Sequence, residues 1–269
     1  MVTIIIIMAI LFLLYLLSVM GRRNHPGLAK LRGWSYAHRG LHDEKRPENS
    51  MAAFRAALEN GYGIELDIHL LADGNLAVMH DAALKRTTGA EGYIEDLTTA
   101  QLSGYHLGGT EETIPQFREV LDLFRGKAPM IIELKAERGN HAALAQAACE
   151  MLSSYQGDYC IESFDPRCLL WLKKNRPDII RGQLTQDYFK DKVSLPWYLK
   201  WALKNQVLNF LTQPDFVAYH FKHRNNTISN TLVRKFWGVQ GVAWTLRSRE
   251  DYDTATAEGW LPIFENFRP

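Results

Sequence analysis

Short apolar runs alternate with amphipathic stretches through most of this 269-residue chain. The apolar runs predict strands, and the amphipathic stretches between them predict helices. Alternating strands and helices favour a parallel sheet. Nine strands are expected, at Trp34–Arg39, Gly63–Leu70, Leu76–His80, Met130–Lys135, Tyr159–Phe164, Ile179–Leu184, Phe216–His220, Val242–Leu246 and Leu261–Phe264.

The second and third strands are too close in sequence to be parallel neighbours. Only Leu71 to Asn75 separates them, whereas a parallel crossover needs roughly a dozen residues or more. These two strands are therefore expected to form an antiparallel hairpin. The eight remaining strands, together with the length of the chain, predict an α/β fold of the TIM-type (β/α)8 barrel class.

Three helices are predicted between the strands. The first runs from a cap at Asn49 or Ser50 to Asn60, the second from His141 to Tyr155, and the third from Arg167 to Asn175. The segment 89–118 is longer than a simple loop, and we expect it to form a small insertion of helices and turns on the barrel.

Residues Leu195 to Gln213 are a further amphipathic helix candidate, in which Trp197, Tyr198 and Trp201 lie beside lysines. Barrel helices that pack their aromatic side chains inward have this pattern, and so do interfacial helices on membranes. We prefer the first interpretation and keep the second open.

The N-terminal segment is the most apolar part of the chain. From Val2 to Met20 it contains no charged residue, and as a helix it would span about 28 Å, close to the hydrocarbon thickness of a bilayer. We therefore expect a transmembrane anchor at 1–23, a linker at 24–33 and the barrel domain at 34–269. Arg22 and Arg23 follow the apolar run, which predicts a single-pass cell-membrane protein with its main domain in the cytoplasm. A buried core helix is the alternative.

Composition excludes several classes of protein. A net charge of +1 gives no bulk attraction to nucleic acid, and 46% hydrophobic with 23% charged residues is typical of a folded domain. Cys149, Cys160 and Cys168 have neither the even number of a disulfide framework nor a CxxC pair for zinc. We expect them to be reduced and buried.

Acidic residues stand near the carboxyl ends of two predicted strands, in the strings IELD (64–67) and IELK (132–135). The carboxyl ends of barrel strands are where catalytic groups gather. Glu65 and Asp67 are two residues apart and so point to the same face. If Glu133 also points inward, three carboxylates converge, and a divalent cation would relieve their repulsion. Oxygen ligands favour Mg²⁺ or Ca²⁺ over zinc.

Histidines and positively charged side chains also lie near the carboxyl ends of predicted strands, in the strings AHRG (37–40), MHD (79–81) and IELK (132–135). His38 and His80 can act as general acid and base near neutral pH. Arg39 and Lys135 can bind a phosphate. Each string alone is also consistent with a structural role, but the combination indicates metal-assisted cleavage of a phosphodiester.

From about Tyr36 to Phe264 the chain resembles the glycerophosphodiester phosphodiesterase family. The motifs that carry the resemblance are HRG (38–40), PENS (47–50), IELDIHLLADGNLAVMHDAALKRTTG (64–89), IEDLT (94–98), IPQF (114–117), IELK (132–135) and AWT (243–245). The resemblance implies that His38 and His80 are an acid–base pair. It also implies that Glu65, Asp67 and Glu133 bind a metal ion, and that Arg39 and Lys135 contact the phosphate.

The resemblance also implies a reaction, which is hydrolysis of glycerophosphodiesters to sn-glycerol 3-phosphate and an alcohol. Either the glycerol 2-hydroxyl or water can be the first nucleophile. One departure is at the C-terminus, where the family usually has a strand like GIITDYP and this chain reads LPIFENFRP. Glu265 and Asn266 replace the Thr-Asp pair, and we interpret this strand as structural closure of the barrel.

The sequence is compatible with three functions. The first is a diesterase that acts on soluble glycerophosphodiesters. The second is a related enzyme for a bilayer lipid such as a lysophospholipid, which the N-terminal helix and the tryptophan-rich segment favour. The third is a non-catalytic membrane-bound binding protein, which the intact set of titratable residues disfavours. The number of subunits, the metal and the head group are left open.

Overall fold

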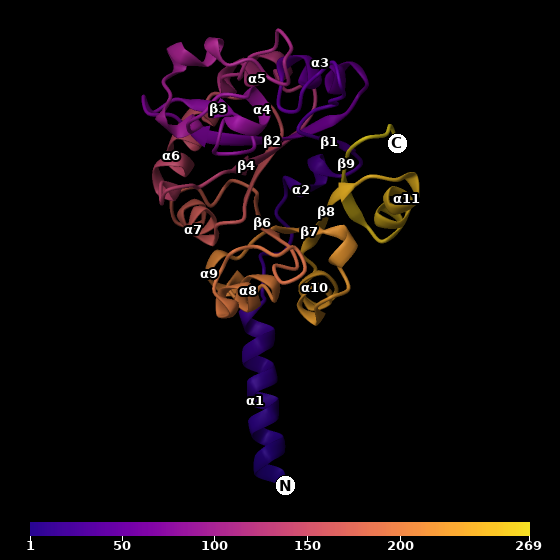
Figure 1. The fold of residues 1–269 in the computed structure, drawn as a ribbon. Helices are drawn as coiled ribbons and strands as arrows, with labels where there is room; N and C mark the ends of the chain where they lie inside the picture. The colour runs from indigo at the N-terminus through magenta and orange to yellow at the C-terminus, as the bar shows by residue number, and fades with distance from the viewer.

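Eight parallel strands close into a barrel in the computed structural model, which describes residues 1–269 (Figure 1). Strand β1 pairs with β2 on one side and with β9 on the other, which completes the ring. The barrel strands are β1 (Tyr36–His38), β2 (Gly63–Leu70), β4 (Met130–Leu134), β5 (Tyr159–Ser163), β6 (Arg181–Thr185), β7 (Phe216–His220), β8 (Gln240–Leu246) and β9 (Trp260–Phe264). The predicted barrel is confirmed.

The ninth strand, β3 (Leu76–Val78), lies outside the barrel and pairs antiparallel with the end of β2. The predicted hairpin is therefore confirmed. Nearly every position of β2 and all of β4 are buried, as expected for parallel strands covered on both faces. The three cysteines are free and buried, as predicted.

Helices surround the barrel (Figure 1). The three that were predicted are α3 (Met51–Glu59), α6 (His141–Leu152) and α7 (Pro166–Asn175). Ser50 caps α3 by accepting a hydrogen bond from the Ala53 amide. The insertion is also present as predicted. It contains two short helices, η1 (Ile94–Asp96) and η2 (Thr99–Gly104), and α4 (Lys85–Thr88) precedes it. Helices α5 (Phe117–Phe124) and α11 (Arg249–Ala257) also belong to the outer layer.

The segment 195–213 differs from the preferred prediction. It forms two short helices, α8 (Trp197–Lys204) and α9 (Asn209–Thr212), rather than one helix. The aromatic side chains were expected to pack inward, and this is wrong, because Trp197 is 74% exposed and Tyr198 and Trp201 are also exposed. Aliphatic residues of the segment, Leu199 and Leu203, line a groove instead.

Helix α1 (Val2–Ser18) projects away from the barrel (Figure 1). It has 17 residues, and none of the structure's helices combines the length and the apolar character needed to span a bilayer. The prediction of a membrane-spanning helix within 1–23 is therefore not supported. Side chains from Met1 to Leu14 are exposed, so α1 is not a buried core helix either.

The end of α1 is fixed to the barrel. The Trp237 indole donates a hydrogen bond to the Leu16 carbonyl, and the Tyr15 hydroxyl lies 2.7 Å from that of Ser229. Further along, Arg22 forms a bidentate pair with the buried Asp215. The predicted linker 24–33 contains a short helix, α2 (Leu28–Leu31), whose leucines are buried in the core at one end of the barrel.

Candidate active site

A tight turn after β1 carries the HRG string. His38 ends the strand, and Arg39 and Gly40 both have positive φ, at 54° and 82°. A Cβ atom on Gly40 would lie 2.9 Å from the backbone of Ala53 in α3, so only glycine fits. The turn brings the Arg39 amide to 3.1 Å from Glu65 Oε2, to which it donates a hydrogen bond.

Buried carboxylates form a row across three neighbouring strands. Strand register places Asp67 of β2 beside Glu133 of β4, and Glu133 beside Glu162 of β5. Oxygens of Glu65, Asp67 and Glu133 all lie within 4.8 Å of one another. The structure thus brings together the three metal-ligand candidates predicted from the sequence, and it adds Glu162 next to them.

The electrostatics of this cluster favour a bound cation. Burial, reinforced by the charges of Asp67 and Glu133, raises the pKa of Glu65 well above its ordinary value. Burial also raises the pKa of Glu133 to about 7, against the opposing effect of Lys135. Glu162 Oε2 has no hydrogen-bond partner, and burial and the neighbouring Glu133 raise the pKa of this carboxyl as well. A hard divalent cation among these oxygens would stabilise the ionised forms, so the donor set fits such an ion.

Both predicted phosphate ligands lie against the carboxylates. Lys135 Nζ is 2.8 Å from Glu133 Oε1 and 3.1 Å from Asp67 Oδ1. Arg39 donates a hydrogen bond to Glu48 and lies 3.6 Å from Asp67. Burial alone would raise the pKa of Asp67, but Lys135, together with His80 and Arg39, holds it well below its ordinary range. Asp67 is therefore the carboxylate that stays ionised.

His38 is oriented by a carboxylate from the end of the chain. Its Nδ1 lies 3.0 Å from Glu265 Oε2, while its Nε2 faces Glu65 at 3.9 Å. Burial lowers the pKa of His38, and the contact with Glu265 opposes this effect. The imidazole is thus neutral at pH 7, and its Nδ1–H donates to Glu265. The lone pair of Nε2 then points into the site.

His80 has a matching arrangement on the other side. Its Nδ1 lies 2.5 Å from Asp81 Oδ1, and Arg86 holds the second oxygen of Asp81. Arg86 also donates to Glu48, which ties this pair to the Arg39 side of the site. Burial lowers the pKa of His80 to about 4, despite the attraction of Asp67. His80 is therefore also neutral at pH 7.

Sequence reasoning missed several members of the site. Glu265 was interpreted as part of a structural strand, but it is the hydrogen-bond acceptor of His38. Asn49 was considered a helix cap, yet its amide donates to Asp67. Glu162 was overlooked. The available signal was an acidic residue near the end of the predicted strand Tyr159–Phe164, and only the strand register shows that it lies beside Glu133.

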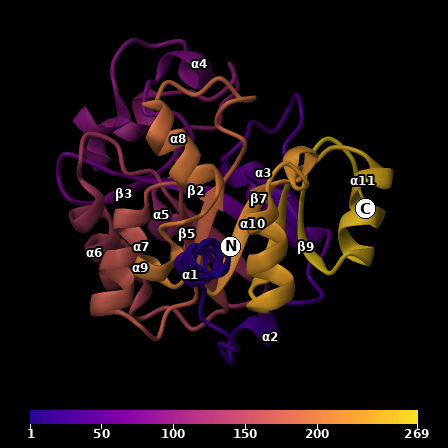
Figure 2. The same cartoon turned by 90° about the horizontal axis from the view of Figure 1, so that it is seen from below.

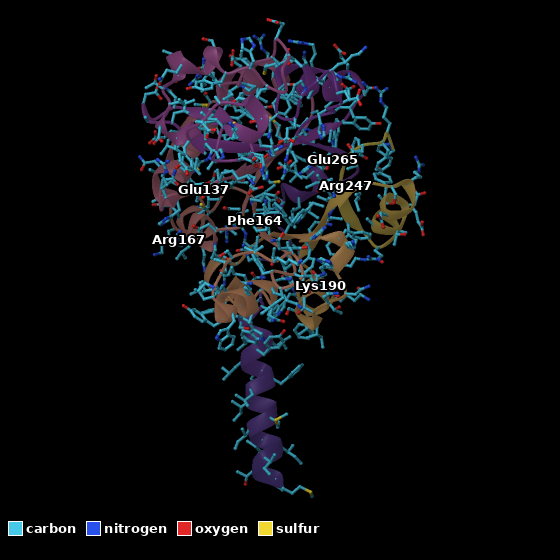
Figure 3. The ribbon with its side chains drawn as sticks, viewed as in Figure 1. Glu137, Phe164, Arg167, Lys190, Arg247 and Glu265 are labelled. Carbon is cyan, nitrogen blue, oxygen red and sulfur yellow. The ribbon has the colours of Figure 1, made fainter.

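The site lies at the carboxyl ends of the strands. A small cavity there is lined by both histidines and three of the acidic residues, with Phe164 and Trp244 on its wall. Figure 3 labels Phe164, together with Glu265 and Arg247, which donates a hydrogen bond to Glu265. A larger groove of about 930 Å³ extends from His80 and Trp244 to Leu199 of α8.

Comparison with known proteins places this site in a family. The profile of the glycerophosphoryl diester phosphodiesterase family matches residues 38–267. The chain belongs to the glycerophosphodiester phosphodiesterase family. It is 30% identical over 237 residues to a glycerophosphodiester phosphodiesterase from Caldanaerobacter subterraneus subsp. tengcongensis, a match that covers 83% of this chain and 89% of the relative. The chain is therefore a phosphodiesterase.

Two further relatives of this phosphodiesterase are informative. A solved Oleispira antarctica phosphodiesterase, in complex with its product sn-glycerol-3-phosphate, has a TM-score of 0.73 and 22% identity, covering 91% of this chain and 95% of the other. A lysophospholipase D from Rattus norvegicus is 33% identical over 136 residues, which cover 46% of this chain and 42% of the relative. Members of this family generally depend on a divalent metal ion, and the cluster at Glu65, Asp67 and Glu133 offers ligands for one.

Proposed function

We propose that this phosphodiesterase hydrolyses glycerophosphodiesters to sn-glycerol 3-phosphate and an alcohol. In this proposal His38 and His80 are the acid–base pair, and Glu65, Asp67 and Glu133 hold Mg²⁺ or Ca²⁺. The observation that carries it is the arrangement of two carboxylate-oriented histidines beside a buried cluster of carboxylates. The glycerol phosphate product bound to a protein of the same fold supports the choice of substrate.

The histidines supply the proton transfers. Each has its Nδ1–H directed to a carboxylate, which leaves Nε2 free to accept or donate a proton. One imidazole removes the proton of the attacking group, water or the glycerol 2-hydroxyl, and the other protonates the departing alkoxide. Attack by water gives glycerol 3-phosphate directly, whereas attack by the 2-hydroxyl gives a cyclic phosphate that a water molecule must then open. A divalent cation, when bound, supplies positive charge for the phosphate oxygens.

The anionic substrate completes the site electrostatically. Both histidines are neutral before substrate binds, because burial lowers their pKa values. A phosphodiester carries a negative charge that raises the pKa of the nearer imidazole, which then becomes the acid. Arg39 and Lys135 stand beside the carboxylates, where their charges can also contact the phosphate.

Release of glycerol 3-phosphate from glycerophosphocholine tests this reaction directly. The full chain in detergent is expected to release it with Mg²⁺ or Ca²⁺ and to stop when a chelator is added. An enzyme-coupled assay for glycerol 3-phosphate measures the rate. Release that is unchanged by chelator would contradict the role of the metal, and no release with any glycerophosphodiester would contradict the substrate class.

The second candidate is a lysophospholipid phosphodiesterase. The observation that favours it is the groove beside the site, because its walls at Leu195, Leu199, Leu203 and Leu208 are suited to an acyl chain. The relative named as a lysophospholipase D adds support. In an assay of choline release, which both substrates give, lysophosphatidylcholine would then be the better substrate, and Leu199→Gln would slow its turnover without slowing that of glycerophosphocholine.

We also propose that α1 holds the protein at the cell membrane with the barrel in the cytoplasm. The exposed apolar side chains of α1 and the two arginines that follow it support this placement. Alkaline phosphatase fused to the C-terminus is expected to be inactive, because it folds only outside the cytoplasm. An active fusion would overturn the orientation.

A further inference from the structure

One face of the barrel carries an unusual number of exposed apolar side chains. They come from α8, α9, α10 (Ile228–Thr231) and the following turn of helix, η4 (Leu232–Phe236). Each is between 45% and 74% exposed, and the set, called here the aromatic face, is Trp197, Tyr198, Trp201, Phe210, Ile228 and Phe236. A surface of this kind on a folded domain usually marks a contact with a protein or a membrane.

Helix α1 leaves the molecule through the aromatic face. Its last turns contact α9, hydrogen-bond to Ser229 of α10 and accept a bond from Trp237, next to Phe236. Seen from below, α9 and α10 lie on either side of the end-on view of α1, and α8 lies farther out on a third side (Figure 2). If α1 is inserted in a bilayer, the aromatic residues around the point where it leaves the barrel therefore lie at the bilayer surface.

The charge of this region suits an anionic surface. Between residues 187 and 238 the chain has eight lysines and arginines, three aspartates and no glutamate, although the whole chain has a net charge of only +1. Two of the eight are paired, Lys204 with Asp187 and Arg224 with Glu258. One of the three aspartates, Asp215, is buried and paired with Arg22. Lys200 and Lys204 lie on α8 among the exposed aromatics, with their ammonium groups 5.8 Å from the Phe189 ring. Aromatic side chains interleaved with lysines are typical of segments that bind at a membrane interface.

The catalytic groove reaches the same region. Its walls include Leu195 and Leu199, which belong to the segment that carries Trp197 and Trp201, and its other end includes His80 and Trp244 of the active site. A lipid surface in contact with α8 would thus lie beside an apolar path to the phosphate-binding groups.

We propose that the aromatic face docks on an anionic lipid bilayer, with α1 inserted in the lipid, so that the groove opens at the bilayer surface. The consequence for catalysis rests on the proposed function, whereas the docking itself does not. Docking places Tyr198 and its neighbours at about the depth of the headgroup boundary, roughly 5–10 Å into the interface.

A pair of matched labels tests the docking. The full chain is prepared with Tyr198→Cys or, as control, Tyr93→Cys, and each is labelled with an environment-sensitive fluorophore. The two tyrosines are 55% and 49% exposed, and the native cysteines are all buried, so labelling is selective. Tyr93 precedes η1 and pairs with Ala83, just before α4, and α4 lies at the opposite side of the barrel from α8 (Figure 1). Vesicles contain phosphatidylcholine, phosphatidylglycerol and a lipid-attached quencher.

The label at position 198 is expected to lose roughly half or more of its fluorescence, and that at 93 almost none. Equal quenching, or none at either position, would overturn the proposal. A spectral shift at 198 that depends on protein concentration and not on lipid would also overturn it, because the face would then bind a second copy of the chain.

An activity measurement separates this inference from the proposed function. The double variant Trp197→Ala/Trp201→Ala alters only exposed side chains outside the catalytic site. It is expected to lower turnover of vesicle-borne lysophosphatidylcholine by roughly tenfold and to leave that of glycerophosphocholine unchanged. Equal turnover of the vesicle lipid by the double variant and by the unaltered protein would contradict the link between docking and catalysis. If neither substrate reacts, the proposed function fails while the quenching result still decides the docking.

Discussion

Replacing His38 by alanine is expected to lower kcat/KM for glycerophosphocholine by about 10²- to 10⁴-fold, the range in which general acid–base catalysis contributes. The imidazole ends β1, where it is fixed by Glu265 and faces the carboxylate cluster. Its removal takes away a proton-transfer group without removing a core side chain. The measurement is steady-state hydrolysis with Mg²⁺ or Ca²⁺, beside thermal unfolding to establish that the fold is retained.

The matched control for this variant is His106→Ala. His106 is exposed and lies in the insertion, where its ring bonds only to a nearby carbonyl. This change is expected to leave kcat/KM unaltered. A His38→Ala protein that retains full activity would show that another group performs the proton transfer.

Glu265→Gln tests whether this residue positions His38. The amide oxygen of glutamine can still accept the Nδ1–H bond, but the negative charge is lost. Because the contact with Glu265 raises the pKa of His38, its loss should move the pH limb governed by His38 to lower pH and lower kcat more than it changes KM. A pH profile identical to that of the unaltered protein would assign Glu265 a structural role only.

Local sequence patterns were sufficient to predict the barrel and most of the site. The bounds of β2 and β7 agree with the predicted strands, because continuous apolar runs between turn residues have few other solutions. Glu65 and Asp67 were placed on one face by their spacing alone, and the structure places them together.

Contacts between distant segments were the part that sequence could not supply. Glu265 meets His38 only because β9 closes on β1. The α8 aromatics were expected to be buried, because an amphipathic pattern shows that a helix has an apolar face but not what covers it. The register that puts Glu162 beside Glu133 likewise depends on the pairing of β4 with β5.

Affinity for Mg²⁺ or Ca²⁺ is expected to change with pH around neutrality. Burial raises the pKa of Glu133 to about 7, so this carboxyl is largely protonated below pH 7 and ionised above it. A metal ion needs the ionised form and must displace the proton. Affinity should therefore rise by about tenfold or more per pH unit as pH increases towards 7, because Glu65, whose pKa burial also raises, must lose its proton as well.

Titration calorimetry of the full chain at several pH values, in buffers of different ionisation enthalpy, measures both the affinity and the protons released. Glu133→Gln is the informative variant, because glutamine has a similar size but no proton to lose. It is expected to bind the metal more weakly, and the rise in affinity towards pH 7 should become shallower by about tenfold per pH unit. An affinity that is constant through neutral pH in the unaltered protein would show that Glu133 is already ionised without metal. In that case Lys135, whose ammonium lies 2.8 Å away, stabilises the carboxylate more than burial opposes it.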